Sequence, residues 1–280
     1  GEARRRILQG SFPEYAVQQF RDMLDYFGEA PFIVRSSSLL EDAYGNAFAG
    51  KYDSVFCVNQ GPVEARLQAL LDAVREVYAS TLGEEALLYR RRRGLLERDE
   101  QMGLLLMRVS GQQTQGHHFP HLAGVGLSYN PFVWHEDIDP DAGVVRLVFG
   151  LGTRAVDRAD DDPTRLVALN APELNPAKED QVQRKMDLLD LRLNQLASAW
   201  VDEVMAEDPT LPLDLLAPLD PRARERRLTF APFFRDSGFL DDFRRMLACL
   251  ETAYAVPVDV EFSLNILPGG DYRMNLLQCR

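Results

Sequence analysis

The sequence has few cysteines, no long apolar run and fewer basic than acidic side chains. Its three cysteines, Cys57, Cys249 and Cys279, lie far apart and form no CxxC pair, which excludes a disulfide framework and a cysteine zinc site. No stretch approaches the ~20 apolar residues that cross a bilayer, and the first ten residues lack an apolar signal core. With 31 basic and 43 acidic residues, the net charge of −12 disfavours nucleic acid and anionic membranes as partners. We therefore expect a cytoplasmic protein with no nucleic-acid or membrane partner.

An arginine and three serines follow directly after an apolar run. Residues 32–34 predict a short buried strand, and residues 35–38 (RSSS) are expected where that strand gives way to an exposed connection. Arginine offers a planar cation, the serines offer rotatable donors, and Gly45 and Gly50 let backbone amides approach an anion. The pattern indicates phosphate binding. A strand followed by an N-cap serine and a surface arginine explains the same spacing.

Further stretches follow in an order that is typical of one family. They are VRSS (34–37), LLED (39–42), FAG (48–50), VYASTLGEEALLYR (77–90), AGVGLSYNP (123–131), GLG (150–152), PVDVEF (257–262) and LLQCR (276–280). Together they resemble the nucleotide-binding domain of the phosphoenolpyruvate synthase and pyruvate phosphate dikinase family. The resemblance is thinnest between residues 159 and 229. It implies an ATP-grasp architecture that binds ATP and magnesium.

The end of the chain predicts a hairpin with one polar face. Residues 256–266 alternate between apolar and polar side chains, which places Asp259 and Glu261 on the same face. The pair of glycines at 269 and 270 predicts a tight turn, and a hairpin symmetric about it pairs Glu261 with Gln278 and Asp259 with Arg280. A bulge or an odd-numbered loop would change this register. Carboxylate and amide oxygens suit magnesium, whereas the alternative is an exposed ladder supported by an Asp–Arg pair.

The resemblance implies a role for each matched residue. It assigns Glu261 and Gln278 to the metal, and Arg35 and Glu261 to catalysis. The residues that it assigns to the nucleotide are Arg35, Ser36, Ser37, Gly50, Lys51, Arg108, Val109, Gln278 and Arg280. For Arg108 and Val109 the expected contacts are made by the backbone only, because Met107 occupies the position where the family usually has a glutamine. Lys51 replaces a second family glutamine and offers a positive charge.

A run of arginines and a group of histidines are not assigned to a binding site. The run of arginines at 90–93 is surrounded by glutamates in a helix-like segment, which favours a solvated, salt-bridged face; Arg90 alone aligns with a family arginine. His117, His118 and His121 have no cysteine or acid interleaved, so their spacing is a weak zinc signal.

The periodicity predicts an α/β (α+β) fold with a mixed, mostly antiparallel sheet flanked by helices, and the resemblance implies that this fold is ATP-grasp-like. Helical spacing is present at 17–27, 63–77, 182–204 and 239–254. Strand patterns are present at 103–109, 123–129, 144–149, 256–266 and 272–278. We expect a phosphate-loop and helical subdomain at 1–100 and an ATP-grasp sheet subdomain at 101–280, with a helical insertion near 160–227.

The expected function is that of the ATP-binding portion of a phosphoenolpyruvate synthase-like phosphotransferase. In that scheme phosphate passes from ATP to a histidine carrier domain and then to pyruvate. Because the sequence does not begin with Met, we expect a portion of a longer polypeptide with phosphohistidine and phosphoenolpyruvate/pyruvate-binding domains downstream. Two alternatives remain: a related dikinase with another acceptor, such as a glucan or an antibiotic, and a degenerate nucleotide-sensing or scaffolding module. Association into a homodimer is left open.

Overall fold

The structure is a computed structural model that describes the chain apart from residues 41–49, 157–161, 176–181 and 221–224. The chain forms two compact units, each of which is described here by itself. Unit 1 comprises Gly1–Val109 and Asp190–Leu196, and unit 2 comprises Ser110–Leu189 and Ala197–Arg280. Both combine antiparallel strands with flanking helices, which confirms the predicted mixed α+β, ATP-grasp-like fold class.

Unit 1 is a small sheet covered by helices. Its elements are α1 (Glu2–Leu8), α2 (Glu14–Phe27), β1 (Phe32–Ser38), β2 (Val55–Cys57), α3 (Val63–Ser80), α4 (Glu84–Arg92) and β3 (Met102–Arg108). The strands lie in the order β2-β1-β3, and both pairs are antiparallel. The predicted helices at 17–27 and 63–77 are confirmed, each beginning after a proline.

One face of this sheet packs against α3. Phe32 and Val34 of β1 are fully buried with Leu70 and Val74 of α3, because alternate residues of a strand point to the same side. The strand continues to Ser38, so the expectation of an exposed connection at 35–38 is wrong. All seven residues of β1 pair with β3, and this ladder satisfies the backbone polar groups of the serines within the sheet.

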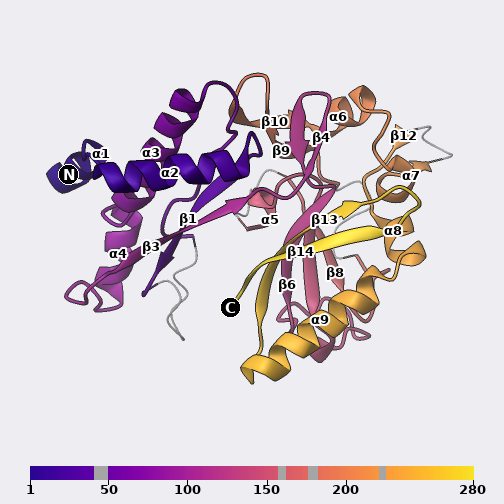
Figure 1. The fold of residues 1–280 in the computed structure, drawn as a ribbon. Helices are drawn as coiled ribbons and strands as arrows, with labels where there is room; N and C mark the ends of the chain where they lie inside the picture. Colours follow the sequence, from indigo (N-terminus) through magenta and orange to yellow (C-terminus); the bar gives the residue numbers. More distant parts are fainter. Residues whose placement is uncertain (41–49, 157–161, 176–181, 221–224) are drawn as a thin grey trace. The chain divides into compact units, whose positions relative to one another are not determined.

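Unit 2 is built around a five-stranded antiparallel sheet, ordered β14-β13-β6-β7-β8 (Figure 1). Its strands are β6 (Leu122–Leu127), β7 (Val144–Val148), β8 (Arg165–Ala168), β13 (Asp259–Ile266) and β14 (Tyr272–Cys279). A second sheet contains β4 (Gln112–Thr114), β5 (His117–Phe119), β9 (Lys185–Asp190) and β10 (Gln195–Trp200). The remaining elements are η1 (Pro140–Ala142), α5 (Thr153–Val156), α6 (Val201–Glu207), α7 (Leu213–Leu216), β11 (Leu219–Asp220), β12 (Glu225–Arg226), α8 (Ala231–Asp236) and α9 (Phe239–Tyr254).

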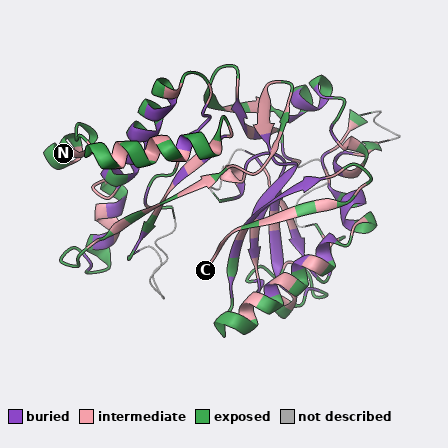
Figure 2. Cartoon of the chain, viewed as in Figure 1, coloured by how far each residue is buried: buried purple, intermediate pink, exposed green. Residues whose placement is uncertain are grey.

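Aromatic side chains fill the core between α9 and the five-stranded sheet. Phe243 of α9 lies with its ring centroid 4.7 Å from that of Phe262 on β13. The ring of Phe243 also packs on Gly126 of β6, where an added Cβ would lie 2.4 Å from it. The close packing of α9 therefore explains the glycine at position 126 of β6. Figure 2 shows the buried strands of this sheet and the exposed outer side of α9.

The predicted helix at 182–204 is wrong. The structure has β9 and β10 there, with α6 starting only at Val201. Met186 and Leu188 are buried with a period of two, as in a strand, and both belong to the core of unit 2. The Asp190 side chain accepts two backbone N–H groups from the next residues, and Asn194 adopts a positive φ of 53°, so the chain turns instead of continuing as a helix. Residues 185–200 therefore form two strands and a turn, and the helices α6 and α7 follow them within the insertion predicted near 160–227.

In the described part of the chain, no helix combines the length and the apolar content that a bilayer crossing requires.

Candidate functional site

In unit 2, four residues form a row across neighbouring strands of the five-stranded sheet. Glu261 of β13 pairs with Gln278 of β14 on one side and with Val125 of β6 on the other. Val125 in turn pairs with Arg146 of β7. Directly opposed residues of antiparallel strands share a face, so these four side chains lie on the face opposite α9, which we call the site face. The predicted pairing of Glu261 with Gln278 is confirmed.

The pairing arises in a different way from the one predicted. The hairpin turn closes with an odd number of residues, because the N–H of Leu267 bonds to the carbonyl of Asp271 and Ile266 pairs with Tyr272. This shifts the register by one residue relative to a symmetric turn. A bulge between Glu261 and Phe262 on the ladder then shifts it back. The bulge therefore returns Gln278 to the face of Glu261.

A cavity of about 130 Å³ opens on the site face. It is lined by Val125, Arg146, Ala155, Val156, Asp259, Val260, Glu261, Gln278 and Arg280. This volume accommodates a phosphate group or a hydrated cation but not a whole nucleotide. Two arginines, two carboxylates and an amide around one small cavity suit a cation and phosphate oxygens together.

Charge around the cavity is partly compensated. The Arg280 guanidinium lies 3.9 Å from the Glu261 carboxylate, so the terminal arginine approaches Glu261 and not only Asp259. Asp259 and Arg280 pair through their backbones, with N–O distances of 2.9 and 2.8 Å. Burial raises the pKa of Asp259 above its ordinary value, and the neighbouring Arg280 opposes that rise.

Helix α5, which follows the GLG segment at residues 150–152, lies beside the cavity on the site face. Gly150 has a φ of +97°, and a Cβ there would lie 2.7 Å from the Asp187 carbonyl oxygen. The Asp187 carboxylate accepts hydrogen bonds from Thr153 Oγ1 at 2.6 Å and Arg154 Nε at 3.0 Å. Arg146 Nη1 donates to the Ala155 carbonyl at 3.1 Å. These bonds fix α5 beside the cavity and orient Arg146.

In unit 1, Arg35 lies on the sheet face opposite α3. It pairs with Leu105, which is 46% exposed, while the flanking residues Phe32 and Val34 face the core. Alternation puts Ser37 on the same face as Arg35 and Ser36 on the α3 side. The side chains of Arg35 and Ser36 therefore point to opposite faces of β1, which corrects the expectation that both reach a phosphate from one loop.

Gly50 and Lys51, which the resemblance assigns to the nucleotide, both lie within the described residues. Gly50 adopts a φ of +71°, as a turn that presents backbone amides requires, and a Cβ there would meet no neighbour within 4 Å. Lys51 Nζ lies 3.7 Å from the Glu85 carboxylate of α4, so its charge is shared with that acid. Gly45 lies outside the described residues.

The backbone of Arg108 and Val109, which is predicted to contact the nucleotide, is largely engaged within unit 1. The Val109 N–H donates to the Pro31 carbonyl at 2.9 Å. Arg108 pairs with Phe32 in the ladder, and its guanidinium donates to the Tyr26 carbonyl at 2.9 Å and lies over the rings of Tyr26 and Phe27. Val109 N–H is thus not available as a donor to a base.

The family described as "Pyruvate phosphate dikinase, AMP/ATP-binding domain" matches residues 1–280. The chain belongs to this pyruvate phosphate dikinase family. A rifampicin phosphotransferase of Streptomyces sviceus is 29% identical over 157 residues, which cover 55% of this chain. The matched segment is only 16% of that relative's length.

Within this dikinase-family domain, sequence reasoning missed Arg146. A single arginine stands in the otherwise apolar segment VVRLV of β7, and its central position in an alternating strand was the available signal. Only the pairing of β7 with β6 and of β6 with β13 shows that Arg146 shares the row of Glu261.

The histidines of the dikinase-family domain do not form a metal centre. His121 is buried, and its Nδ1 accepts the Ile266 N–H at 2.9 Å. Among the residues that the structure describes, no group of three His, Cys, Asp or Glu side chains is placed to hold a metal ion. On the site face, the oxygen ligands beside the cavity are the side chains of Asp259, Glu261 and Gln278.

Proposed function

We propose that this chain is the ATP-binding portion of a phosphoenolpyruvate synthase-like phosphotransferase. The observation that carries the proposal is the Glu261–Gln278 pair on the site face, in line with Arg146, in a chain that its family matches throughout. In this proposal phosphate passes from ATP to a histidine of a carrier domain and then to pyruvate. We infer from the reduced cysteines that it acts in the cytoplasm.

The proposal assigns roles to residues of each unit, and each unit is considered by itself. In unit 2, Glu261 and Gln278 would hold Mg²⁺, which would neutralise phosphate charge, and Arg146 and Arg280 would bind phosphate oxygens. In unit 1, Arg35, Ser37 and the backbone of Gly50 would contact phosphates, with Lys51 adding charge that Glu85 partly compensates. Positioning and charge neutralisation are what phosphoryl transfer mainly requires of a protein.

The test is titration calorimetry of the chain with ATP, with and without Mg²⁺. We expect binding that strengthens when Mg²⁺ is present. Glu261→Gln keeps the shape of the side chain but removes its charge, so the gain from Mg²⁺ should disappear. Glu203→Gln, an exposed acid on α6, is the matched control and should retain the gain. Absence of ATP binding by the wild-type chain would contradict the proposal.

A second candidate is a phosphotransferase with a different acceptor. It is favoured by the similarity to the rifampicin phosphotransferase, which is a similarity over part of this chain. The natural polypeptide that carries this chain, incubated with ATP, Mg²⁺ and either pyruvate or rifampicin, separates the two candidates. Phosphorus NMR of the products identifies the acceptor that gains the phosphate.

A third candidate is a nucleotide-sensing module that binds ATP without transferring phosphate. Met107 in place of the family glutamine and the engagement of Lys51 by Glu85 favour it. In that case the calorimetric titration would show ATP binding, and phosphorus NMR would show no transfer to either acceptor.

A further inference from the structure

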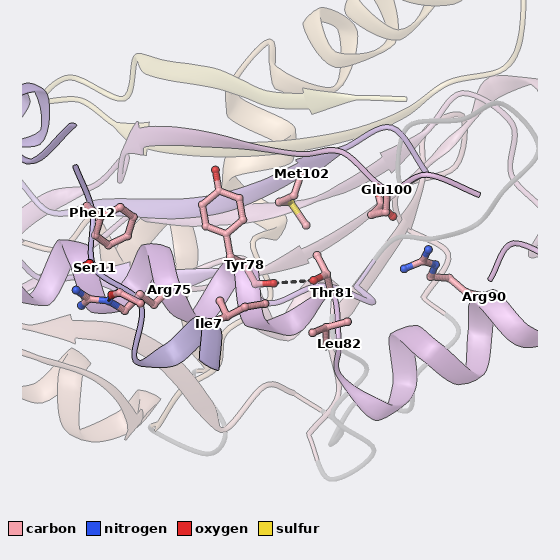
Figure 3. Close-up of a pocket in the computed structure, with 11 residues that line it drawn as sticks. Ile7, Ser11, Phe12, Arg75, Tyr78, Thr81, Leu82, Arg90, Glu100 and Met102 are labelled. Atoms are coloured by element: carbon pink, nitrogen blue, oxygen red, sulfur yellow. Dashed lines mark hydrogen bonds between the residues drawn. The ribbon is translucent and has the colours of Figure 1, made fainter. Parts of the chain in front are cut away.

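Unit 1 contains a cavity of about 550 Å³ that the proposed nucleotide contacts do not use. Its walls come from α1, the connection to α2, α3, the last turn of α4 and the start of β3, as Figure 3 shows. The lining residues are Ile7, Gly10, Ser11, Phe12, Arg75, Tyr78, Thr81, Leu82, Arg90, Glu100 and Met102. A cavity of this volume has the size of a small-molecule site.

The cavity and Arg35 lie on opposite faces of the three-stranded sheet. Met102 lines the cavity and packs with Leu104 and Leu106 toward the α3 core. Arg35 pairs with Leu105, whose side chain points to the other face. A molecule in this cavity therefore cannot contact Arg35 through the sheet, and the two sites are distinct.

One end of the cavity carries polar groups with unused hydrogen-bonding capacity. Arg90, expected on a solvated face, is only 8% exposed. Its Nη2 donates to the Arg98 carbonyl at 3.0 Å, and its Nε has no partner among the described residues. Glu100 Oε2 accepts the Tyr52 hydroxyl, and Glu100 Oε1 likewise has no partner in the described part of the chain. The two side chains form no ion pair with each other, although both line the same cavity. Both unpaired atoms are enclosed, and buried groups left unpaired in this way are costly. A bound molecule that either side chain turned to meet would therefore be favoured.

The rest of the lining is apolar and aromatic. Phe12, Tyr78 and Met102 lie along the wall in Figure 3, and the Arg75 guanidinium sits 5.0 Å from the centre of the Phe12 ring. Arg75 is already compensated, since its Nε donates to the Gly10 carbonyl at 2.8 Å and Nη1 donates to Asp72 at 2.7 Å. Such walls suit a ring, through contacts with aromatic side chains and with a methionine sulfur.

We propose that this cavity binds a small ring-bearing molecule whose head group both accepts and donates hydrogen bonds, as a carboxamide does. The carbonyl oxygen of the head group accepts from Arg90, and its N–H donates to Glu100. The ring lies against Phe12, Tyr78 and Met102. The head group is neutral because Arg90 and Glu100 offset each other in charge.

The test compares three probes of one shape: benzamide, which has an acceptor and a donor, benzoate, which has acceptors only, and benzamidine, which has donors only. Saturation-transfer NMR on the full chain gives their affinities. Benzamide is expected to bind about tenfold more tightly than either of the others, since each of them leaves one protein group unpaired. Equal affinities, or no binding of benzamide, would overturn the proposal.

Variants locate the binding. Ser11→Trp places a large side chain at the exposed mouth of the cavity and should abolish benzamide binding, while Ala69→Trp, an exposed α3 position outside the lining, should not. Arg35→Ala should leave benzamide binding unchanged. Loss of binding in Arg35→Ala would assign the molecule to the nucleotide site and refute a separate cavity.

Discussion

At the scale of residues, the polar groups of this domain serve two purposes. Asp187 and Gln183 form hydrogen bonds with backbone and side-chain groups around β7 and α5, and these bonds stabilise the fold. Arg35 and Glu261 instead lie on sheet faces beside an exposed position or a cavity. Substitutions of the second group should alter ligand binding more than stability.

Arg35→Ala tests this distinction in unit 1. Loss of a charge-assisted contact to phosphate should weaken ATP binding by roughly 1.5–3 kcal/mol. The melting temperature without ligand should stay nearly unchanged, because Arg35 lies outside the α3 core. Calorimetric titration and thermal unfolding measure the two effects, with the exposed Arg91→Ala as the control. Unchanged ATP affinity would make Arg35 a surface residue.

His121 should make stability depend on pH. Burial lowers its pKa to about 4, and the nearby Asp208 carboxylate acts in the opposite direction. The unfolded chain therefore takes up the proton first, near pH 6.5. Stability that is present above this pH is lost as the pH falls from about 6.5 toward 4, on the order of 3 kcal/mol in total.

Urea unfolding at pH 7.5 and pH 4.5 measures this loss. His121→Asn keeps a side-chain acceptor near the Ile266 N–H but cannot titrate, so the difference between the two pH values should shrink. His135→Asn, which alters an exposed histidine, is the control and should retain the difference. An undiminished difference in His121→Asn would assign the pH dependence to other groups.

At the scale of elements, periodicity predicted those helices and strands whose faces differ most. The helices α2, α3 and α9 and the strands β6, β7, β13 and β14 were found within a few residues of their expected positions. The segment 182–204 failed because a hairpin can place apolar residues at helical spacing by coincidence. A helix is prevented there by the turn at residues 190–194. The Asp190 side chain accepts hydrogen bonds from two backbone amides, and Asn194 adopts a positive φ; the spacing of apolar residues contains neither signal.

The candidate site was predicted only in part, because local alternation places residues on a face but does not show which strands pair. Alternation placed Glu261 on a polar face, and its partner Gln278 was found although the turn is odd, because the bulge compensates. Arg146 belongs to the row only through long-range pairing of β6 with β7 and β13, which a local pattern does not contain. The side-chain direction of Ser36 was missed because β1 is longer than its apolar run.

The packing of α9 on β6 gives a prediction at the element scale. Gly126→Ala would place a Cβ 2.4 Å from Phe243 and should destabilise the protein by roughly 1–3 kcal/mol, since a buried ring must move. Gly152→Ala is the matched control, because its Cβ would meet Ala123 at 3.4 Å, an ordinary contact. Urea unfolding measures both. Equal stability of the two variants would show that α9 shifts without cost.

At the scale of the whole molecule, each unit has its own hydrophobic core. Leu70 and Val74 belong to the core of unit 1, and Leu147 and Phe243 belong to that of unit 2. The chain passes from unit 2 into unit 1 and back again at residues 190–196. Two cores in one chain allow two cooperative unfolding transitions.

Scanning calorimetry of two core variants should resolve these transitions. Leu70→Ala should lower the transition of unit 1, and Leu147→Ala should lower that of unit 2, each by about 2–5 kcal/mol of stability. Each peak of the wild-type trace is assigned to a unit by the variant that shifts it. If both variants shifted a single peak by the same amount, the units would unfold as one.

The bulge in β14 has a consequence for how this sequence tolerates insertions and deletions. Removing the codon for Leu277, the unpaired residue of the bulge, should leave Gln278 opposite Glu261 and preserve Mg²⁺-dependent ATP binding. Removing the codon for Met274 should instead turn Asn275 toward the core and destabilise the hairpin. In a relative of this chain, loss of the one residue just before the equivalent of Gln278 is thus compatible with an intact site. Loss of a residue at the equivalent of Met274 or Asn275 is not.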